Sequence, residues 1–335
     1  MNPMLSALSG HRPERLPVWF MRQAGRSLPE YRAIREGTTI LEACLIPELA
    51  AEITLQPVRR HKVDAAIFFS DIMTPLVLAG VEVEIHSGVG PVIERPVRTA
   101  ADVDRITRHA LIETSPITEA VRTVVAELGD DTPLIGFAGA PFTLAAYLVE
   151  GRGSRDHLAA RAMMHADPVA WHRLLGWCAD LSGQFLGVQV DAGARVVQLF
   201  DSWAGALTRE DYVRHVAPHS AAVLAAVEGR VPRIHFGTGT RHILPEMAAC
   251  GVEAMGIDYR TPLDEAAALL PGLPLQGNID PAMLAAGWAP LEAHARDVVE
   301  RGRAAPAHVV NLGHGVPPTT DPGVLTDLVA LLHAL

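Results

Sequence analysis

The sequence predicts a single (β/α)8 barrel of the TIM type. Eight short, almost fully apolar runs recur along the 335 residues, and each is followed by Gly or a polar residue. Between them lie segments with apolar residues at three- and four-residue steps, which is typical of helices packed on one face. No linker-like or low-complexity stretch divides the chain, so we expect one domain over residues 1–335. A doubly wound parallel sheet is the structural alternative.

The eight apolar runs are the expected strands. A run that is apolar at every position is buried on both faces, as in a parallel sheet covered by helices. In chain order the runs are PVWFM (17–21), AAIFFS (65–70), PLIGFA (133–138), RVVQLF (195–200), VPRIHF (231–236), EAMGI (253–257), LPLQGN (273–278) and HVVNLG (308–313).

Other local patterns complete the predicted barrel. Residues 80–95, GVEVEIHSGVGPVIER, alternate apolar and polar around Ser-Gly and Gly-Pro, which predicts a β-hairpin inserted after the second strand. Late helices begin at caps, where Thr261, Asp280 and Asp321 each precede a proline. The segment LTDLVALLHAL (325–335) has the spacing of a final helix.

Composition limits the partners and the compartment. The formal net charge of −10 argues against nucleic acid or an anionic membrane as a general partner, although a basic pocket remains possible. No stretch approaches the roughly 20 apolar residues of a membrane span, and the first residues do not read as a secretory signal. Three cysteines stand far apart without a CxxC pair. We therefore expect a protein of the reducing cytoplasm.

Arginines gather just after the first expected strand. PVWFMRQAGRSLPEYRAIRE contains Arg22, Arg26, Arg32 and Arg35, and Arg22 directly ends a buried run. An unpaired guanidinium there is costly unless it meets an anion. Arg22 and Arg26 could instead form a solvated helix face, and acidic neighbours could neutralise Arg32 and Arg35. The placement favours an anion site.

Further polar residues follow other strands, where barrel enzymes perform their chemistry. Asp71 leaves the run FFSDIM, and spacing alone leaves open whether it caps a helix or binds a ligand. Ser202 follows the fourth run. His314 lies between two glycines, which permit close approach of a ligand. Tyr147 could be core or site. Since HExxH, GxSxG, a P-loop and a complete Rossmann fingerprint are missing from the sequence, we expect a cofactor-free enzyme that binds a polyanion.

Several blocks together resemble the uroporphyrinogen decarboxylase family. These are PVWFMRQAGRSLPEYR, FFSDIMTPLVLAG, GFAGAPFTLAAYLVEG, QLFDSWAG, LQGNIDP and NLGHGVPP, and the similarity runs from about residue 11 to the C-terminus. The resemblance implies a carboxy-lyase, a homodimeric barrel without metal or organic cofactor. It would convert the four acetate side chains of uroporphyrinogen III to methyls, giving coproporphyrinogen III and CO2 in haem biosynthesis.

The resemblance also implies roles for individual residues. Asp71 would accept hydrogen bonds from the pyrrole N–H groups and stabilise a ring cation as CO2 leaves. Arg22 is a candidate proton donor, with a bound water or a substrate carboxyl as rivals. The substrate-binding residues would be Arg22, Gln23, Ala24, Arg26, Arg35, Asp71, Tyr147, Ser202 and His314.

Two other functions are alternatives for this fold. Zinc-dependent cobamide:thiol methyltransferases share this barrel and carry a His-x-Cys pair at the end of a middle strand. The matching stretch here is His235-Phe236-Gly237, without the thiolate. A non-catalytic tetrapyrrole carrier is the second alternative, and loss of Asp71 or of the arginines would be its mark.

Overall fold

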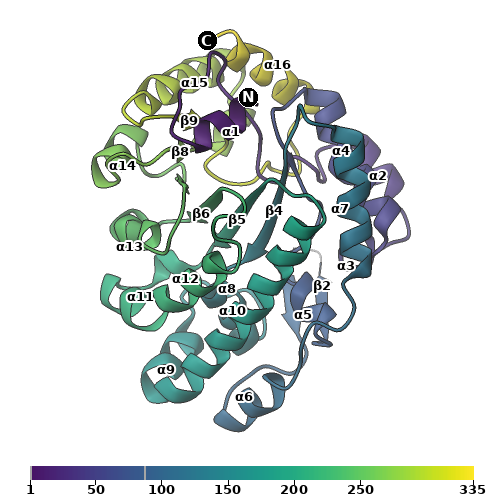
Figure 1. Cartoon of the computed structure of the whole chain (residues 1–335), viewed down its shortest axis with the longest axis vertical. Coiled ribbons are helices and arrows are strands. Elements are labelled where there is room, and N and C mark those ends of the chain that lie inside the picture. Colours follow the sequence, from purple (N-terminus) through teal and green to yellow (C-terminus); the bar gives the residue numbers. More distant parts are fainter. Residues whose placement is uncertain (1, 87) are drawn as a thin grey trace.

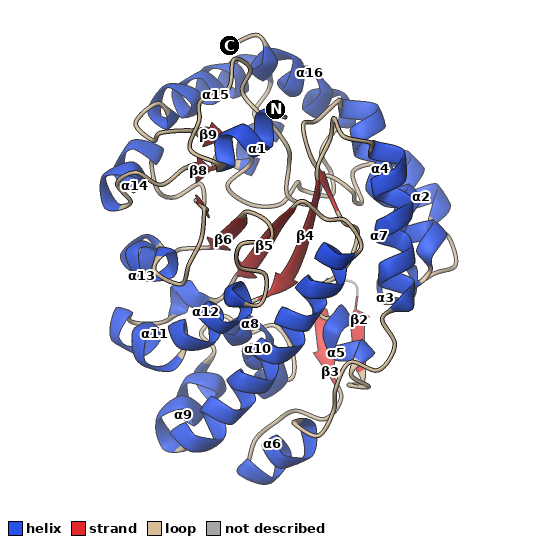
Figure 2. Cartoon of the chain, in the orientation of Figure 1, coloured by secondary structure: helices blue, strands red, loops and turns tan. Residues whose placement is uncertain are grey.

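The computed structural model describes residues 2–86 and 88–335. In this part of the chain, parallel strands form one curled sheet surrounded by helices (Figures 1 and 2). Its order β1-β4-β5-β6-β7-β8-β9 follows the chain without the reversal that a doubly wound sheet requires. The strands are β1 (Ala66–Ile67), β4 (Leu134–Gly139), β5 (Val196–Asp201), β6 (Arg233–Gly237), β7 (Ala254–Gly256), β8 (Leu275–Gln276) and β9 (His308–Val309).

Each of these strands overlaps a predicted run. The prediction of a strand at residues 17–21, the first run, was wrong. This run forms an isolated parallel bridge, Val18 with Val310, in place of a strand. The amide of Val310 donates to the Pro17 carbonyl at 2.8 Å, and the Asp64 amide donates to the Val18 carbonyl at 2.8 Å. The segment therefore lies between β9 and β1 and closes the barrel.

The first run is not a regular strand because its amides find other acceptors. Pro17 has no N–H to donate. The Phe20 amide donates to Gln23 Oε1 and the Met21 amide to Asn311 Oδ1, each at 3.0 Å. These side chains satisfy buried amides that a neighbouring strand would otherwise have to bond.

The predicted hairpin is confirmed as β2 (Val83–His86) paired antiparallel with β3 (Gly90–Ile93). It follows β1 and α5, and Figure 2 shows it apart from the main sheet. Ser87, in the predicted turn, lies outside the described residues. A further bridge joins Val92 to Arg152, so the hairpin is tied to the chain that follows α8.

Helices cover the outside of the sheet (Figure 1). Within the described residues, no helix has both the length and the apolar character needed to cross a membrane. The α-helices are α1 (Pro3–Leu8), α2 (Pro29–Ile34), α3 (Ile40–Leu45), α4 (Pro47–His61), α5 (Thr74–Leu78), α6 (Ala100–Ile106), α7 (Ser115–Leu128), α8 (Pro141–Glu150), α9 (Leu158–Ala166), α10 (Pro168–Asp191), α11 (Arg209–His215), α12 (Ala217–Ala225), α13 (Leu244–Ala248), α14 (Leu263–Leu269), α15 (Trp288–Gly302) and α16 (Pro322–His333). Short 3-10 helices are η1 (Ala204–Ala206), η2 (Arg241–Ile243) and η3 (Pro281–Ala285).

Two of the three predicted caps are confirmed. Asp280 Oδ1 accepts from the Ala282 amide at the start of η3, and Asp321 Oδ1 accepts from the Gly323 amide at the start of α16. Thr261 does not cap α14, which has Pro262 at the cap position and no side-chain cap bond. Thr261 is buried, and its carbonyl instead accepts from Asn278 Nδ2 at 2.6 Å.

Asp64 stabilises the segment that closes the barrel. Its side chain is only 2% exposed and lies just before β1. Oδ2 accepts from the Val18 amide at 2.8 Å and contacts His333 Nε2 of α16 at 2.7 Å, while Oδ1 pairs with Arg15. One carboxylate thus joins the closing segment, the first strand and the last helix.

Replacing Asp64 should therefore weaken the whole fold. In Asp64→Ala the buried Val18 amide loses its acceptor, and we expect the free energy of unfolding to fall by about 2–4 kcal/mol. Asp104→Ala removes an aspartate of an exposed ion pair with Arg173 and should cost less than about 1 kcal/mol. Urea unfolding followed by circular dichroism measures both, and equal losses would contradict the role given to Asp64.

Candidate active site

A cavity of about 330 Å³ opens at the carboxyl ends of the strands, a volume typical of small-molecule sites. Asp71 follows β1, Ser202 follows β5 and His314 follows β9, so strands far apart in sequence each contribute one polar residue. Of the predicted site residues, the cavity wall includes Arg22, Ala24, Arg26, Asp71, Ser202 and His314. An adjoining cavity of about 460 Å³ shares Arg22 and His314 and adds Arg260.

Arg22 lies where the two cavities meet. Its backbone has a φ of 61°, a left-handed conformation that non-glycine residues rarely adopt and that is often found at functional sites. Its side chain passes over Gly315, where an added Cβ would lie 2.5 Å from Arg22 Cδ. Arg260 pairs with Asp258 at 2.7 Å, but Arg22 has no ion-pair partner among the described residues. Its guanidinium is available to an anion.

Asp71 lines the same cavity as this guanidinium. Oδ1 accepts from the Met73 amide at 2.9 Å, and the Asp71 amide contacts Thr74 Oγ1 at 3.2 Å. Burial raises the pKa of Asp71, while the hydrogen bond from Met73 and the charge of Arg22 lower it in part. The second carboxylate oxygen, Oδ2, makes no hydrogen bond among the described residues, so it remains available to a ligand.

His314 lies on the rim between Gly313 and Gly315. A Cβ at Gly313 would collide with the backbone of Tyr259, so the chain approaches that loop more closely than another residue allows. Burial lowers the pKa of His314, and the charges of Arg22 and Arg260 lower it further. The imidazole is therefore kept mostly neutral at pH 7 and can accept or donate one hydrogen bond.

Three predicted residues lie behind the wall of the described cavity. The side chain of Gln23 is fully buried, where Oε1 accepts from Phe20 and Nε2 donates to the Ala65 carbonyl at 3.0 Å. The Arg35 guanidinium lies 5.2 Å from the ring centroid of Tyr31, which does line the cavity. Its Nε and Nη1 are buried without a partner among the described residues.

Tyr147, on α8, belongs to an aromatic layer beside the cavity. Its ring meets Trp203 edge-on at 5.9 Å, and Trp203 lies 5.0 Å from the ring of His157. Burial raises the pKa of Tyr147, and the charge of Asp71 raises it further. The hydroxyl is therefore protonated and can donate a hydrogen bond.

Sequence reasoning missed the apolar floor of the cavity. Phe137, Phe200 and Phe236 come from β4, β5 and β6, and neighbouring rings pack edge-to-face at 5.4 and 5.9 Å. Each lies near the end of a predicted strand, so strand alternation was the signal that could have found them. Such a floor lowers the local dielectric and strengthens the effect of Asp71 and Arg22.

His235 lies between the barrel wall and the outer helices, away from the mouth. Burial lowers its pKa, but Asp201, whose Oδ2 lies 3.8 Å from Nε2, and Cys250 outweigh this and raise it to about 9. A Cβ at Gly237 would lie 2.6 Å from Thr240 Cγ2. A side chain at the position of the methyltransferase cysteine would therefore require Thr240 to move.

Comparison with solved structures places the fold among known barrels. A methyltransferase from Methanosarcina mazei superposes with a TM-score of 0.81 over 98% of this chain and 97% of that chain. The two sequences are 19% identical, so the likeness concerns the fold alone.

Sequence comparison is far more specific. The family described as Uroporphyrinogen decarboxylase (URO-D) matches residues 1–335. A uroporphyrinogen decarboxylase from Arthrobacter sp. (strain FB24) is 62% identical over 100% of this chain and 97% of its own length. Another, from Salinispora tropica, is 55% identical over 100% of this chain and 90% of its own length. The chain belongs to the uroporphyrinogen decarboxylase family.

Proposed function

We propose that this enzyme decarboxylates the four acetate side chains of uroporphyrinogen III to methyls, yielding coproporphyrinogen III and CO2 in haem biosynthesis without a cofactor. The observation that carries the proposal is the pairing of Asp71, half-buried above an apolar floor, with an Arg22 guanidinium that has no ion-pair partner in the described chain. Each step breaks one C–C bond, releases CO2 and places a proton on the remaining carbon.

The arginines bind the substrate's carboxylates. Arg22 and Arg26 face the cavity directly, and Arg guanidinium groups bind carboxylates through two parallel hydrogen bonds. Arg35 reaches the site through Tyr31, or directly after a small rotation toward a carboxylate that would satisfy its buried Nε and Nη1. Ala24 lines the same wall, and Gln23 holds the loop in place.

Asp71 provides the electrostatic part of catalysis. Its available carboxylate oxygen accepts hydrogen bonds from pyrrole N–H groups. When a pyrrole carbon is protonated, the ring becomes a cation that accepts the electrons of the breaking bond. A nearby carboxylate with a phenylalanine floor stabilises that cation more strongly than water would. Tyr147, Ser202 and His314 provide the remaining polar contacts around the macrocycle.

Arg22 is the candidate proton donor by position. A guanidinium with a pKa above about 12 is a weak acid, so a water or a substrate carboxyl held by Arg22 competes for this role. In each case the Arg22 charge acts on Asp71, since it lowers the pKa of that carboxyl. Arg22 therefore favours the ionised form of Asp71, against the effect of burial.

We also infer that the chain acts as one barrel domain, in the cytoplasm and as a homodimer. The three cysteines are free and buried in the structure, which suits a reducing compartment. Exposed apolar side chains on the outer helices, Leu158, Val169 and Val213, offer surface for self-association. Sedimentation equilibrium should give twice the 35.9 kDa of the chain, whereas the monomer mass at micromolar concentration would refute the dimer.

The activity itself can be tested by anaerobic incubation with uroporphyrinogen III. Oxidation and chromatography by carboxyl number should reveal products descending from eight carboxylates to four. Asp71→Asn keeps an acceptor for the Met73 amide but loses the charge, so we expect kcat to fall about 10²–10³-fold.

Asp321→Asn is the matched control, because Asp321 lines neither cavity and an amide can still cap α16. Its activity should stay close to that of the unmodified enzyme. Recovery of unchanged uroporphyrinogen with the unmodified enzyme would reopen the carrier function, in which binding occurs without turnover. Equal losses in the two variants would contradict the role of Asp71.

The pH dependence tests the coupling of Arg22 to Asp71. The ionised carboxylate is the active form, so kcat/KM should fall as the pH drops through the pKa of Asp71. Because the Arg22 charge lowers that pKa, Arg22→Met should move this acid limb to higher pH, while Arg22→Lys, which keeps the charge, should leave it near its original position. A limb that stays fixed in Arg22→Met would show that another group titrates.

A further inference from the structure

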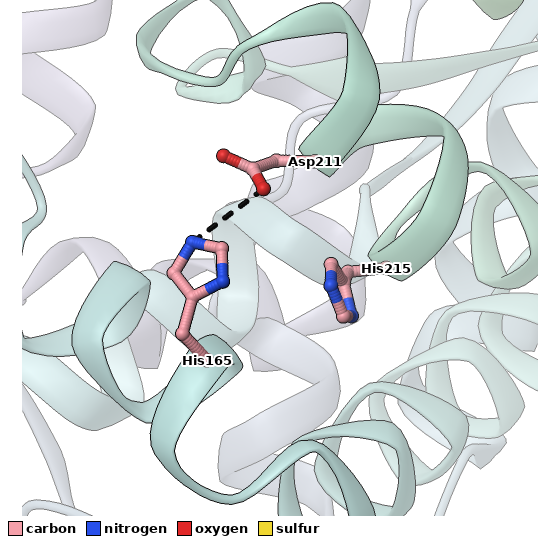
Figure 3. Close-up of side chains that lie close together, drawn as sticks. All are labelled: His165, Asp211 and His215. Carbon is pink, nitrogen blue, oxygen red and sulfur yellow. Dashed lines mark ion pairs between the residues drawn. The ribbon is translucent and has the colours of Figure 1, made fainter.

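A second group of ionisable side chains lies away from the cavity, on the outer helices. His165 is in the last turn of α9, and Asp211 and His215 are on α11. Figure 3 shows the three side chains approaching one another across the gap between these helices. One potential ligand atom from each lies within 4.8 Å of the others, and His165 Nε2 lies 3.5 Å from Asp211 Oδ1.

The helices hold two of these groups in fixed positions. Asp211 and His215 are four residues apart on α11, so they lie one turn apart on the same face. The Asp211 amide donates to Oγ1 of the N-cap residue Thr208 at 3.1 Å, and this bond fixes the first turn. Indole Nε1 of Trp171 donates to the His215 carbonyl at 3.3 Å. The pair is therefore rigid, while His165 reaches it from the neighbouring helix.

One ring nitrogen of His215 lacks a hydrogen-bond partner among the described residues. The residue is 5% exposed, and its Nδ1 is buried with no hydrogen-bond partner among the described residues. Leaving a buried ring nitrogen without a partner costs free energy, and native structures nearly always satisfy such atoms. The centroid of this ring lies 5.8 Å from that of His165 and 5.5 Å from that of His172.

Two imidazoles and one carboxylate are a ligand set for zinc. Zn²⁺ binds His nitrogen and Asp oxygen at about 2.0–2.2 Å, which puts ligand atoms about 3.3 Å apart in a tetrahedral site. The separation of His165 Nε2 from Asp211 Oδ1, 3.5 Å, is already close to this value. The side chain of His165 is 58% exposed and is free to rotate toward His215. Mg²⁺ and Ca²⁺ prefer oxygen ligands only.

We propose that His165, Asp211 and His215 bind one Zn²⁺ ion that joins α9 to α11, with water in the remaining position. None of the three lines either described cavity, so the ion lies apart from the proposed decarboxylation site. A rival pair adjoins the site, because His172 Nδ1 lies 2.9 Å from His219 Nε2. The test must therefore distinguish the two.

The experiment measures zinc binding to the full-length protein after EDTA treatment and dialysis. Titration calorimetry with ZnCl2 should give one ion per chain, and Zn²⁺ should raise Tm where equal Mg²⁺ does not. His165→Ala and Asp211→Asn should each weaken Zn²⁺ binding at least about tenfold, since even outer partners of metal ligands contribute that much. His86→Ala is the matched control, because His86 also contacts a single carboxylate, Glu84, at 2.8 Å.

Two results would overturn the proposal. The first is that His165→Ala binds zinc as tightly as the unmodified protein does. If His172→Ala then loses zinc binding, the ion lies on the rival pair. The other is an equal rise of Tm with Mg²⁺, which would indicate general cation binding. Because His165 is exposed, His165→Ala should melt at the same temperature as the unmodified protein without zinc, so a folding defect cannot imitate the loss of binding.

Discussion

The barrel depends on a closure made by very few hydrogen bonds. Val18 bridges to Val310 on one side, and on the other its carbonyl accepts from the Asp64 amide. Seven neighbouring strands otherwise form an open curled sheet in the described chain, with two edges that need partners. The closing segment satisfies both edges and then turns sharply at Arg22. The cation at the centre of the site is thus carried by the segment that completes the fold.

The mouth of the barrel contains arginines and an aspartate that form no ion pair with one another among the described residues. Arg22, Arg26 and Asp71 all line the cavity, and the Asp71 carboxylate accepts a hydrogen bond from the Met73 amide. Elsewhere on the surface, arginines are joined to acidic neighbours, as Arg60 is to Glu30 at 2.6 Å. Charged groups that make no ion pair within the described chain and lie above an apolar floor can act on a bound ligand. An acidic protein can therefore bind a polyanion at one basic opening.

Successive side chains of a strand point alternately into the barrel and out toward the helices, so polar groups on the two sides of the sheet have different roles. On β5, Gln198 and Phe200 face inward, and Gln198 Oε1 accepts from Gln276 Nε2 at 2.9 Å inside the barrel. Asp201, one position further, faces outward and accepts from Thr143 at 2.9 Å. Polar groups on the outer side serve packing between the wall and the helices. The proposed zinc ligands extend this outer layer to the helix surface.

Local sequence patterns were enough to predict the strand runs, the hairpin and the strand-end residues, because burial on both faces and strand ends leave such patterns. That residues 17–21 form a bridge follows from the folded structure, since the side chains of Gln23 and Asn311 accept from amides that a strand would use. The folded structure also placed Arg35 against Tyr31 and assembled the phenylalanine floor from three strands. These contacts join residues far apart in the chain, and no local spacing records which side chains will meet.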